Sequence, residues 1–193
     1  MDWILASASP RRKELFGEVI GTAFAVIPAR GEEDAGAFTT PDELVERLAR
    51  QKAEEVASLP EAKGKAVLGA DTVVALNGKI FGKPADEDEA FRMLKALSGN
   101  THEVYTGVCI CYPLEKGGCE KVVFSVCTKV KFFPLTNEEI LAYIATGSPL
   151  DKAGAYGIQD GGLVEKIEGS FSNVVGLPVE ECKKVVAKLF KSM

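Results

Sequence analysis

The chain has 193 residues, a formal net charge of −5, and 46% hydrophobic and 26% charged residues. These values are typical of a globular protein that is long enough to form one or two small domains around a full core. The acidic balance argues against a partner of duplex nucleic acid, which requires a basic face. No run of about 18 apolar residues is present, so we expect no membrane span. Any anion that this protein binds must then be held by local cations or by a metal.

The first residues lack the basic and apolar regions of a secretory signal. The five cysteines form no C-x-x-C pair, and three of them lie in strand-like apolar runs. This pattern is typical of reduced thiols. The sequence therefore predicts a cytoplasmic protein.

A short apolar strand over residues 3–6 is followed at once by the sequence SASPRR. Ser9 is a good N-cap for a helix that starts at the following proline. The start of this helix carries the hydroxyls of Ser7 and Ser9 and the guanidinium groups of Arg11 and Arg12, and such a position attracts anions. Solvated surface arginines are the alternative. Because arginine is unfavourable in a first helical turn, we favour a phosphate site.

A second helix is predicted from Thr40 to about Ser58, with Glu43 completing a capping box. Its apolar stripe consists of Val45, Leu48, Ala49 and Val56. Lys52 occupies the position that completes this stripe. Its side chain either extends along the apolar surface to reach solvent or binds an anion in a cleft.

Residues 67–76 form an apolar run that contains one carboxylate, Asp71. An ionised carboxylate is costly to bury unless a cation or a metal compensates it. Asn77 and Gly78 predict a tight hairpin, and Lys83 follows the returning strand.

The second half of the chain alternates between helices and β-rich segments. We expect helices from Asp86 to Gly99, from Thr136 to Gly147 and over 178–190. We expect an antiparallel hairpin over 103–112 and 121–133, a glycine-rich loop over 151–162, a strand over 163–167 and a turn-rich connection over 169–177. The single histidine, His102, is interpreted as structural, since neither a zinc site nor a Ser/His/Asp triad has its other members. The order of elements predicts an α/β fold with a mixed parallel and antiparallel sheet and flanking helices.

The residues that violate local rules are Arg11, Arg12, Lys52, Asp71 and Lys83, and such violations are expected at functional sites. A structural ion-pair network is one interpretation, with Glu33 and Asp151 as further partners. Four cations around one carboxylate require additional negative charge, and a bound polyphosphate would supply it. Polyphosphates also need a divalent metal with hard oxygen ligands. Asp71 would then either hold that metal or activate a water molecule.

Six motifs in order along the chain resemble the Maf family of nucleoside triphosphate pyrophosphatases. They are SASPRR at 7–12, GADTVV at 69–74, GKP at 82–84, LSG at 97–99, DKAGAYGIQ at 151–159 and VGLP at 175–178. The resemblance implies hydrolysis of a nucleoside triphosphate to its monophosphate and pyrophosphate, with Mg²⁺ or Mn²⁺. It also implies a single domain over 1–193 with two lobes around a central cleft, similar to inosine triphosphate pyrophosphatases, and a homodimer as the assembly expected of the family.

The resemblance also implies roles for individual residues. The catalytic set is Asp71, as base and metal neighbour, with Lys52, Lys83 and Arg12; the second metal-site residue is Glu33. The resemblance assigns phosphate handling to Ser7, Arg12, Lys52 and Lys83. Together with the hydroxyl and guanidinium groups at the helix start, the full predicted phosphate-binding set is Ser7, Ser9, Arg11, Arg12 and Lys152. Arg11, Thr72 and Gln159 match the branch that hydrolyses dTTP and UTP, and a glutamine amide suits the imide edge of thymine or uracil.

Two other functions use the same residues. The 7-methyl-GTP branch of the family would carry an aromatic residue at position 11 and glutamate at 159, so it is disfavoured. A nucleotide-sensing regulator of septation would bind a nucleotide without turning it over. The intact set of Asp71, Lys52 and Lys83 argues against that regulator.

Overall fold

A computed structural model of the chain describes residues 1–31, 40–114 and 118–191. Its strands form one mixed sheet in the order β2-β1-β3-β5-β6-β7, with β4 paired to β3. The strands are β1 (Trp3–Leu5), β2 (Ala25–Val26), β3 (Ala66–Leu76), β4 (Lys79–Phe81), β5 (Thr101–Pro113), β6 (Cys119–Phe132) and β7 (Val164–Glu168). β1 is parallel to β2 and β3, and the other pairs are antiparallel. The predicted α/β class with a mixed sheet is confirmed.

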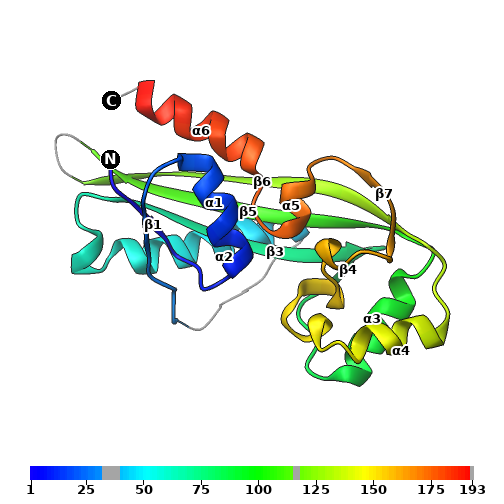
Figure 1. Ribbon diagram of the computed structural model, residues 1–193. Helices are drawn as coiled ribbons and strands as arrows, with labels where there is room; N and C mark the ends of the chain where they lie inside the picture. Colours follow the sequence, from blue (N-terminus) through cyan, green and yellow to red (C-terminus); the bar gives the residue numbers. More distant parts are fainter. Residues whose placement is uncertain (32–39, 115–117, 192–193) are drawn as a thin grey trace.

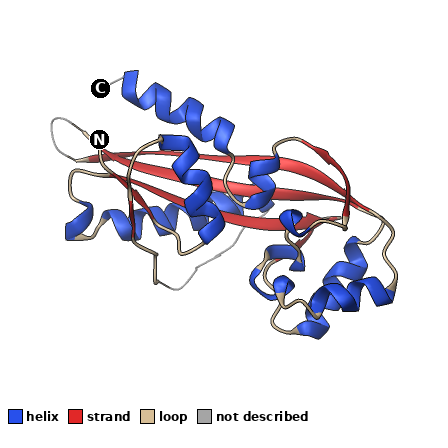
Figure 2. Ribbon diagram, viewed as in Figure 1, coloured by secondary structure: helices blue, strands red, loops and turns tan. Residues whose placement is uncertain are grey.

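Helices cover both faces of the sheet (Figures 1 and 2). They are α1 (Pro10–Ile20), α2 (Pro41–Ala57), α3 (Glu87–Leu97), α4 (Asn137–Ile144), α5 (Phe171–Val175) and α6 (Val179–Lys191), with 3-10 turns at Pro60–Ala62, Ser148–Asp151, Ala153–Ala155 and Ile158–Asp160. α2 lies on one face and α1, α5 and α6 on the other, while α3 and α4 pack together at the end of the sheet near β4. None of the helices in the described ranges has the length and apolar character to cross a membrane.

The alternation of side chains along β3 assigns its residues to the two faces. Leu68 packs in the core cluster that contains Phe16 of α1 and Val186 of α6. Its neighbour Val67 packs in a different cluster with Ala53 of α2. Odd-numbered residues of β3 therefore face α2. Of the even-numbered residues, Ala66, Leu68 and Ala70 face α1 and α6, and Val74 packs against α3.

α2 lies unusually close to the sheet because two glycines face it. A Cβ atom added to Gly69 would lie 2.5 Å from the carbonyl oxygen of Ala49, and one added to Gly107 would lie 2.3 Å from that of Val45. These contacts are with backbone, which cannot move aside. Gly107 is the direct partner of Asp71 in the β3–β5 pairing, so the closest approach of α2 occurs beside Asp71.

One edge of β3 is open in its middle. β1 pairs with residues 66–68 of β3 and β4 pairs with residues 74–76. Between them, across residues 69–73, the described part of the chain provides no strand partner on this edge. Asp71 and Thr72 lie in this gap.

The residues at helix starts and turns predicted one capping box and the hairpin turn correctly, and a second capping box wrongly. The capping box of Thr136 and Glu139 is complete, and Asn77 and Gly78 have positive φ angles of 51° and 77°, as a tight hairpin requires. The predicted capping box at Thr40 is wrong, because that side chain makes no capping hydrogen bond. The connection over 169–177 contains a helix, α5, which is too short for its periodicity to be visible in the sequence.

His102 is buried in an aromatic cluster at the α3–α4 end of the sheet. Its Nε2 lies 2.8 Å from the hydroxyl of Tyr156, and its ring meets those of Phe132 and Tyr156 edge to face at 4.9 and 5.4 Å. Burial lowers the pKa of His102 to about 4. The interpretation of His102 as a structural residue is confirmed by this position.

We expect Gly107→Ala to destabilise the fold by about 3 kcal/mol or more, because the new methyl group would overlap the backbone of Val45. Gly17→Ala is the matched control: a Cβ there meets only Phe24 at 3.9 Å, inside helix α1. That variant should gain about 0.5–1 kcal/mol from helix propensity. Urea unfolding midpoints measure both changes, and equal stability of the two variants would contradict the close approach of α2.

Stability should fall as the pH drops from about 6.5 to 4. The unfolded chain binds a proton at His102 below pH 6.5, whereas the native imidazole stays neutral until about pH 4. The loss amounts to about 3 kcal/mol over this interval. His102→Gln removes the titrating group, so its unfolding free energy should decline less between pH 7 and pH 4.5 than that of the wild type. Parallel pH profiles of the two proteins would refute this assignment.

Candidate active site

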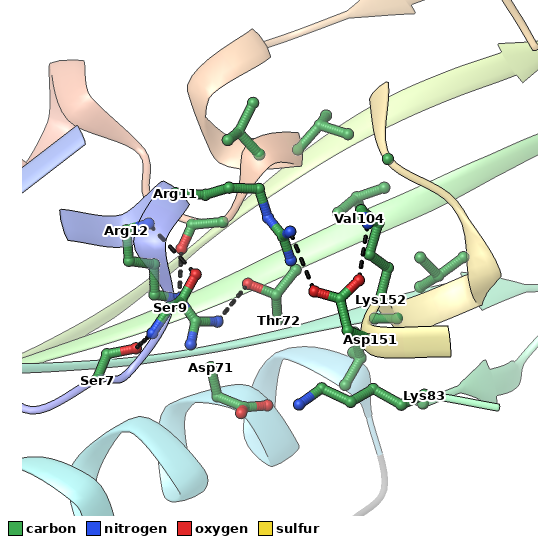
Figure 3. A pocket seen from close by; sticks show the side chains of 18 of the residues that line it. Ser7, Ser9, Arg11, Arg12, Asp71, Thr72, Lys83, Val104, Asp151 and Lys152 are labelled. Carbon is green, nitrogen blue, oxygen red and sulfur yellow. Dashed lines mark hydrogen bonds and ion pairs between the residues drawn. The ribbon is translucent and has the colours of Figure 1, made fainter. Parts of the chain in front are cut away.

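The gap in the edge of β3 opens into a cleft of about 800 Å³, a volume typical of ligand sites (Figure 3). The cleft is lined by the segment from Ala6 to Arg12, by α2, by the middle of β3, and by residues around 82, 151–159 and 174–176. The predicted site residues that line it are Ser7, Ser9, Arg11, Arg12, Lys52, Asp71, Thr72, Lys83, Lys152 and Gln159. The remaining one, Glu33, lies outside the described residues.

Asp71 and Lys52 form a buried ion pair on the α2 side of the cleft. Lys52 Nζ donates a hydrogen bond to Asp71 Oδ1 at 2.5 Å, and the two side chains are 16% and 12% exposed. The carboxylate therefore has the compensating cation that its burial requires. Of the two predicted positions for Lys52, the structure shows the one inside the cleft.

Arg12 lies on the opposite side of β3. Its Nε donates to the carbonyl oxygen of Gly176 at 2.9 Å, and its Nη2 donates to Thr72 Oγ1 at 3.0 Å. The start of α1 that carries it is capped as predicted, since Ser9 Oγ accepts from the backbone N–H of Arg12 at 3.4 Å, and Ser7 Oγ accepts from the N–H of Ser9 at 3.3 Å. These bonds fix the plane of the guanidinium group at the rim of the cleft.

Asp151 joins two cations across the cleft. Its carboxylate lies 3.3 Å from Arg11 Nη1 and 2.7 Å from Lys152 Nζ. Partial burial is the largest single influence on this carboxylate and opposes ionisation, but the hydrogen bond and charge of Lys152 and the charge of Arg11 outweigh it, so the pKa of Asp151 is lowered. Lys152 Nζ also donates to the carbonyl oxygen and the hydroxyl of Ser148 at 2.6 and 2.9 Å. Binding of a phosphate by Lys152 would therefore require it to exchange one of these bonds.

Lys83 differs from the other cations of the cleft. Its side chain is exposed and extends toward Asp71 (Figure 3), and within the described ranges it has no ion pair. In the ion pairs between described residues, Asp71 is paired with Lys52, and Asp151 is paired with Arg11 and Lys152. An anionic ligand in the cleft would lie within the reach of the Lys83 side chain.

The loop that carries Gln159 is held by side chains that the sequence did not single out. Asp160 Oδ2 accepts hydrogen bonds from Tyr143 at 2.5 Å and Ser148 at 2.6 Å, and the Tyr143 hydroxyl accepts from the N–H of Gly157 at 2.9 Å. Gln159 itself is exposed at the mouth of the cleft. The loop is therefore fixed while the amide is left accessible.

The sequence analysis did not single out Thr106 or Asn173, and it named Gly176 only as part of a motif. Thr106 Oγ1 lies 2.9 Å from Thr72 Oγ1, and Gly176 accepts from Arg12. Gly176 belongs to a motif that was recognised, but nothing local in the sequence pairs Thr106 with Thr72, because that contact depends on the register of two distant strands.

The donor set of the cleft fits Mg²⁺ or Mn²⁺ bound together with a substrate. The described residues contain no group of three or more metal-ligating side chains, so a complete protein cage is not found among them. Mg²⁺ is usually bound by one or two carboxylates together with substrate phosphates and waters. Asp71 supplies one such carboxylate at the Lys83 side of the cleft.

Comparisons with known proteins identify the family of the chain. The family model described as "Maf-like protein" matches residues 2–189. A dTTP/UTP pyrophosphatase of Thermococcus gammatolerans is 50% identical over 179 residues, which cover 92% of this chain and 91% of that protein. One from Citrifermentans bemidjiense is 53% identical over 180 residues, with coverage of 92% and 90%. Among solved structures, a Ham1 protein of Coxiella burnetii has a TM-score of 0.49 at 14% identity and covers 97% of this chain and 99% of its own.

Proposed function

Because this chain belongs to the Maf family, we propose that it is a nucleoside triphosphate pyrophosphatase that hydrolyses dTTP and UTP to the monophosphate and pyrophosphate. Three relatives that carry the name dTTP/UTP pyrophosphatase are about 50% identical to this chain over nine-tenths of its length. The structural observation that supports the proposal is the buried Asp71 carboxylate, which lies in a cleft lined by five cationic side chains.

In this reaction a water molecule attacks phosphorus at the α–β anhydride, and the bond to the bridging oxygen breaks to release pyrophosphate. Asp71 accepts the proton of that water as general base. Lys52 donates a hydrogen bond to Asp71 Oδ1 at 2.5 Å and so fixes the orientation of the carboxylate. None of the hydrogen bonds among the described residues involves the other carboxylate oxygen, Oδ2, of Asp71. Lys83 extends from the exposed side of the cleft toward the same carboxylate. Its ammonium group would neutralise the charge that develops on the phosphate oxygens.

The remaining cations and hydroxyls bind the rest of the triphosphate. Ser7, Ser9 and Arg12 stand at the start of α1, where the positive end of the helix dipole favours anions. Arg11 and Lys152 approach from the side of Asp151 and would exchange its carboxylate for phosphate oxygens. Thr72 and Gln159, with Arg11, select the base.

The metal that we propose is Mg²⁺ or Mn²⁺, held by Asp71 and by Glu33, which lies outside the described residues. When bound, it supplies positive charge to the phosphate oxygens and aligns the anhydride for attack. Hard carboxylate and phosphate oxygens support this choice of ion.

We further propose that the whole chain acts as one domain whose two lobes enclose this cleft, in the cytoplasm and as a homodimer. The presence of cleft residues from both ends of the chain supports the single domain. The five unpaired cysteines are consistent with a reducing compartment.

Turnover of a nucleotide panel tests the activity. We expect pyrophosphate release from dTTP and UTP, with 7-methyl-GTP a poor substrate, and a loss in kcat of about a hundredfold to ten-thousandfold in Asp71→Asn, because the general base is removed. Asp88→Asn, an exposed carboxylate on α3 away from the cleft, is the matched control and should retain full activity. Full activity of Asp71→Asn would refute the mechanism. Tight binding of UTP without turnover would instead identify a nucleotide sensor.

Removal of divalent metal should abolish the activity. Dialysis against EDTA is expected to reduce pyrophosphate release from UTP to background, since the phosphate charge is then neutralised by the protein's cations alone. Mg²⁺ or Mn²⁺ should restore it, whereas added Na⁺ should not. Undiminished turnover in EDTA would show that no metal takes part.

A further inference from the structure

A chain of hydrogen bonds runs from the cleft into the core on the α5 side of β3. Thr72 lines the cleft and is directly opposite Thr106 of β5 in the strand register. The two hydroxyl oxygens are 2.9 Å apart, and Thr106 is fully buried. Beyond Thr106 the chain ends at the backbone carbonyl of Asn173 in α5, at 3.0 Å.

The direction of these hydrogen bonds is fixed by the carbonyl at the buried end. A carbonyl oxygen can only accept, so Thr106 donates its one hydroxyl hydrogen to Asn173. Thr106 can then only accept from Thr72, and Thr72 donates its own hydrogen inward. Arg12 Nη2, which can only donate, points at Thr72 Oγ1 from the opposite side at 3.0 Å. All donors in the chain therefore point from the cleft to the core.

The consequence is a hydroxyl with a single function toward a ligand. Thr72 has no hydrogen left to donate, and one of its two lone pairs already accepts from Arg12. The other lone pair of Thr72 Oγ1 can accept a hydrogen bond from a ligand in the cleft, since the described residues direct no further donor at this oxygen. Thr72 thus presents an acceptor to a ligand and cannot present a donor.

We propose that Thr106 is a positioning residue for base selection: by accepting the hydrogen of Thr72, it makes Thr72 an acceptor for the N3–H of uracil or thymine. Cytosine has a lone pair at N3 instead of a hydrogen, so an acceptor facing N3 could not form a hydrogen bond with it. Discrimination against cytosine therefore originates in a buried threonine that never touches the substrate. This inference rests on the proposed function only in that a pyrimidine nucleotide occupies the cleft.

Thr106→Val tests the inference without disturbing the rest of the chain. Valine has nearly the same shape as threonine, and the carbonyl of Asn173 still accepts from the N–H of Gly176 at 3.1 Å. The hydroxyl of Thr72 would lose its acceptor and become free to donate to N3 of cytosine. We expect the preference for UTP over CTP to fall by about tenfold, the effect of one neutral hydrogen bond, and Thr106→Ser to restore it.

The preference is measured in two ways, by kcat/KM for UTP and CTP, and by Kd for their α,β-methylene analogues, which cannot be cleaved at the α–β bridge. If no nucleotide is hydrolysed but the analogue of UTP binds more tightly than that of CTP, and Thr106→Val removes the difference, the proposed function fails and this inference stands. If UTP and CTP are hydrolysed equally well by the wild type, or if a folded Thr106→Val keeps the full preference, the inference fails and the proposed function stands.

Thr128→Val provides the matched control. Thr128 is equally buried and accepts a hydrogen bond from Asn173 Nδ2 at 3.0 Å, but none of its hydrogen bonds among the described residues goes to Thr72 or Thr106. Thr128→Val should leave the preference for UTP over CTP, in kcat/KM and in Kd, unchanged. A change as large as that in Thr106→Val would show that displacement of α5 sets the ratio, and would overturn the role assigned to the hydrogen of Thr106.

Discussion

The close packing of α2 against the sheet is the constraint on which the rest of the site depends. Gly69 and Gly107 allow the backbone of α2 to approach strands that a single Cβ atom would otherwise hold away. At that distance the side chain of Lys52 reaches Asp71 and compensates a charge that the surrounding strand could not otherwise contain. The two glycines belong to different strands, and the register that places Gly107 opposite Asp71 makes them act on one spot. A wider spacing would leave the carboxylate buried and without its cation.

The open edge of β3 divides the chemistry of the cleft between two adjacent residues. Successive side chains of a strand point to opposite faces, so Asp71 faces α2 and Lys52, while Thr72 faces α1, Arg12 and α5. Because β1 ends before this point and β4 begins after it, a ligand can reach both faces from the same edge. Asp71 and Lys52, proposed for hydrolysis, thereby lie on one face of β3 and Thr72, proposed for base selection, on the other, and Arg12 joins the two sets through its hydrogen bond to Thr72.

The cations of the cleft are held in different ways, which suggests different parts in binding. Lys52 and Arg12 are fixed by short bonds inside the protein, Arg11 and Lys152 share the carboxylate of Asp151, and Lys83 extends toward Asp71 from the solvent side. A triphosphate bound in the cleft would replace Asp151 as the partner of Arg11 and Lys152. Such an exchange keeps Arg11 and Lys152 paired with an anion and releases the exposed carboxylate of Asp151 to solvent.

Much of this protein was determined by sequence alone. Apolar periodicity and turn residues predicted the mixed α/β class, the hairpin at Asn77 and Gly78 and the long β5–β6 pair, because these depend on neighbours within a few residues. The anomaly of Asp71 and the cations near the chain's motifs also marked the site. Sequence did not place Thr106 against Thr72, Asp151 between Arg11 and Lys152, or α5 within a turn-rich segment. Those contacts join residues up to 140 positions apart, and strand register and the packing of α2 decide them, which no local pattern records.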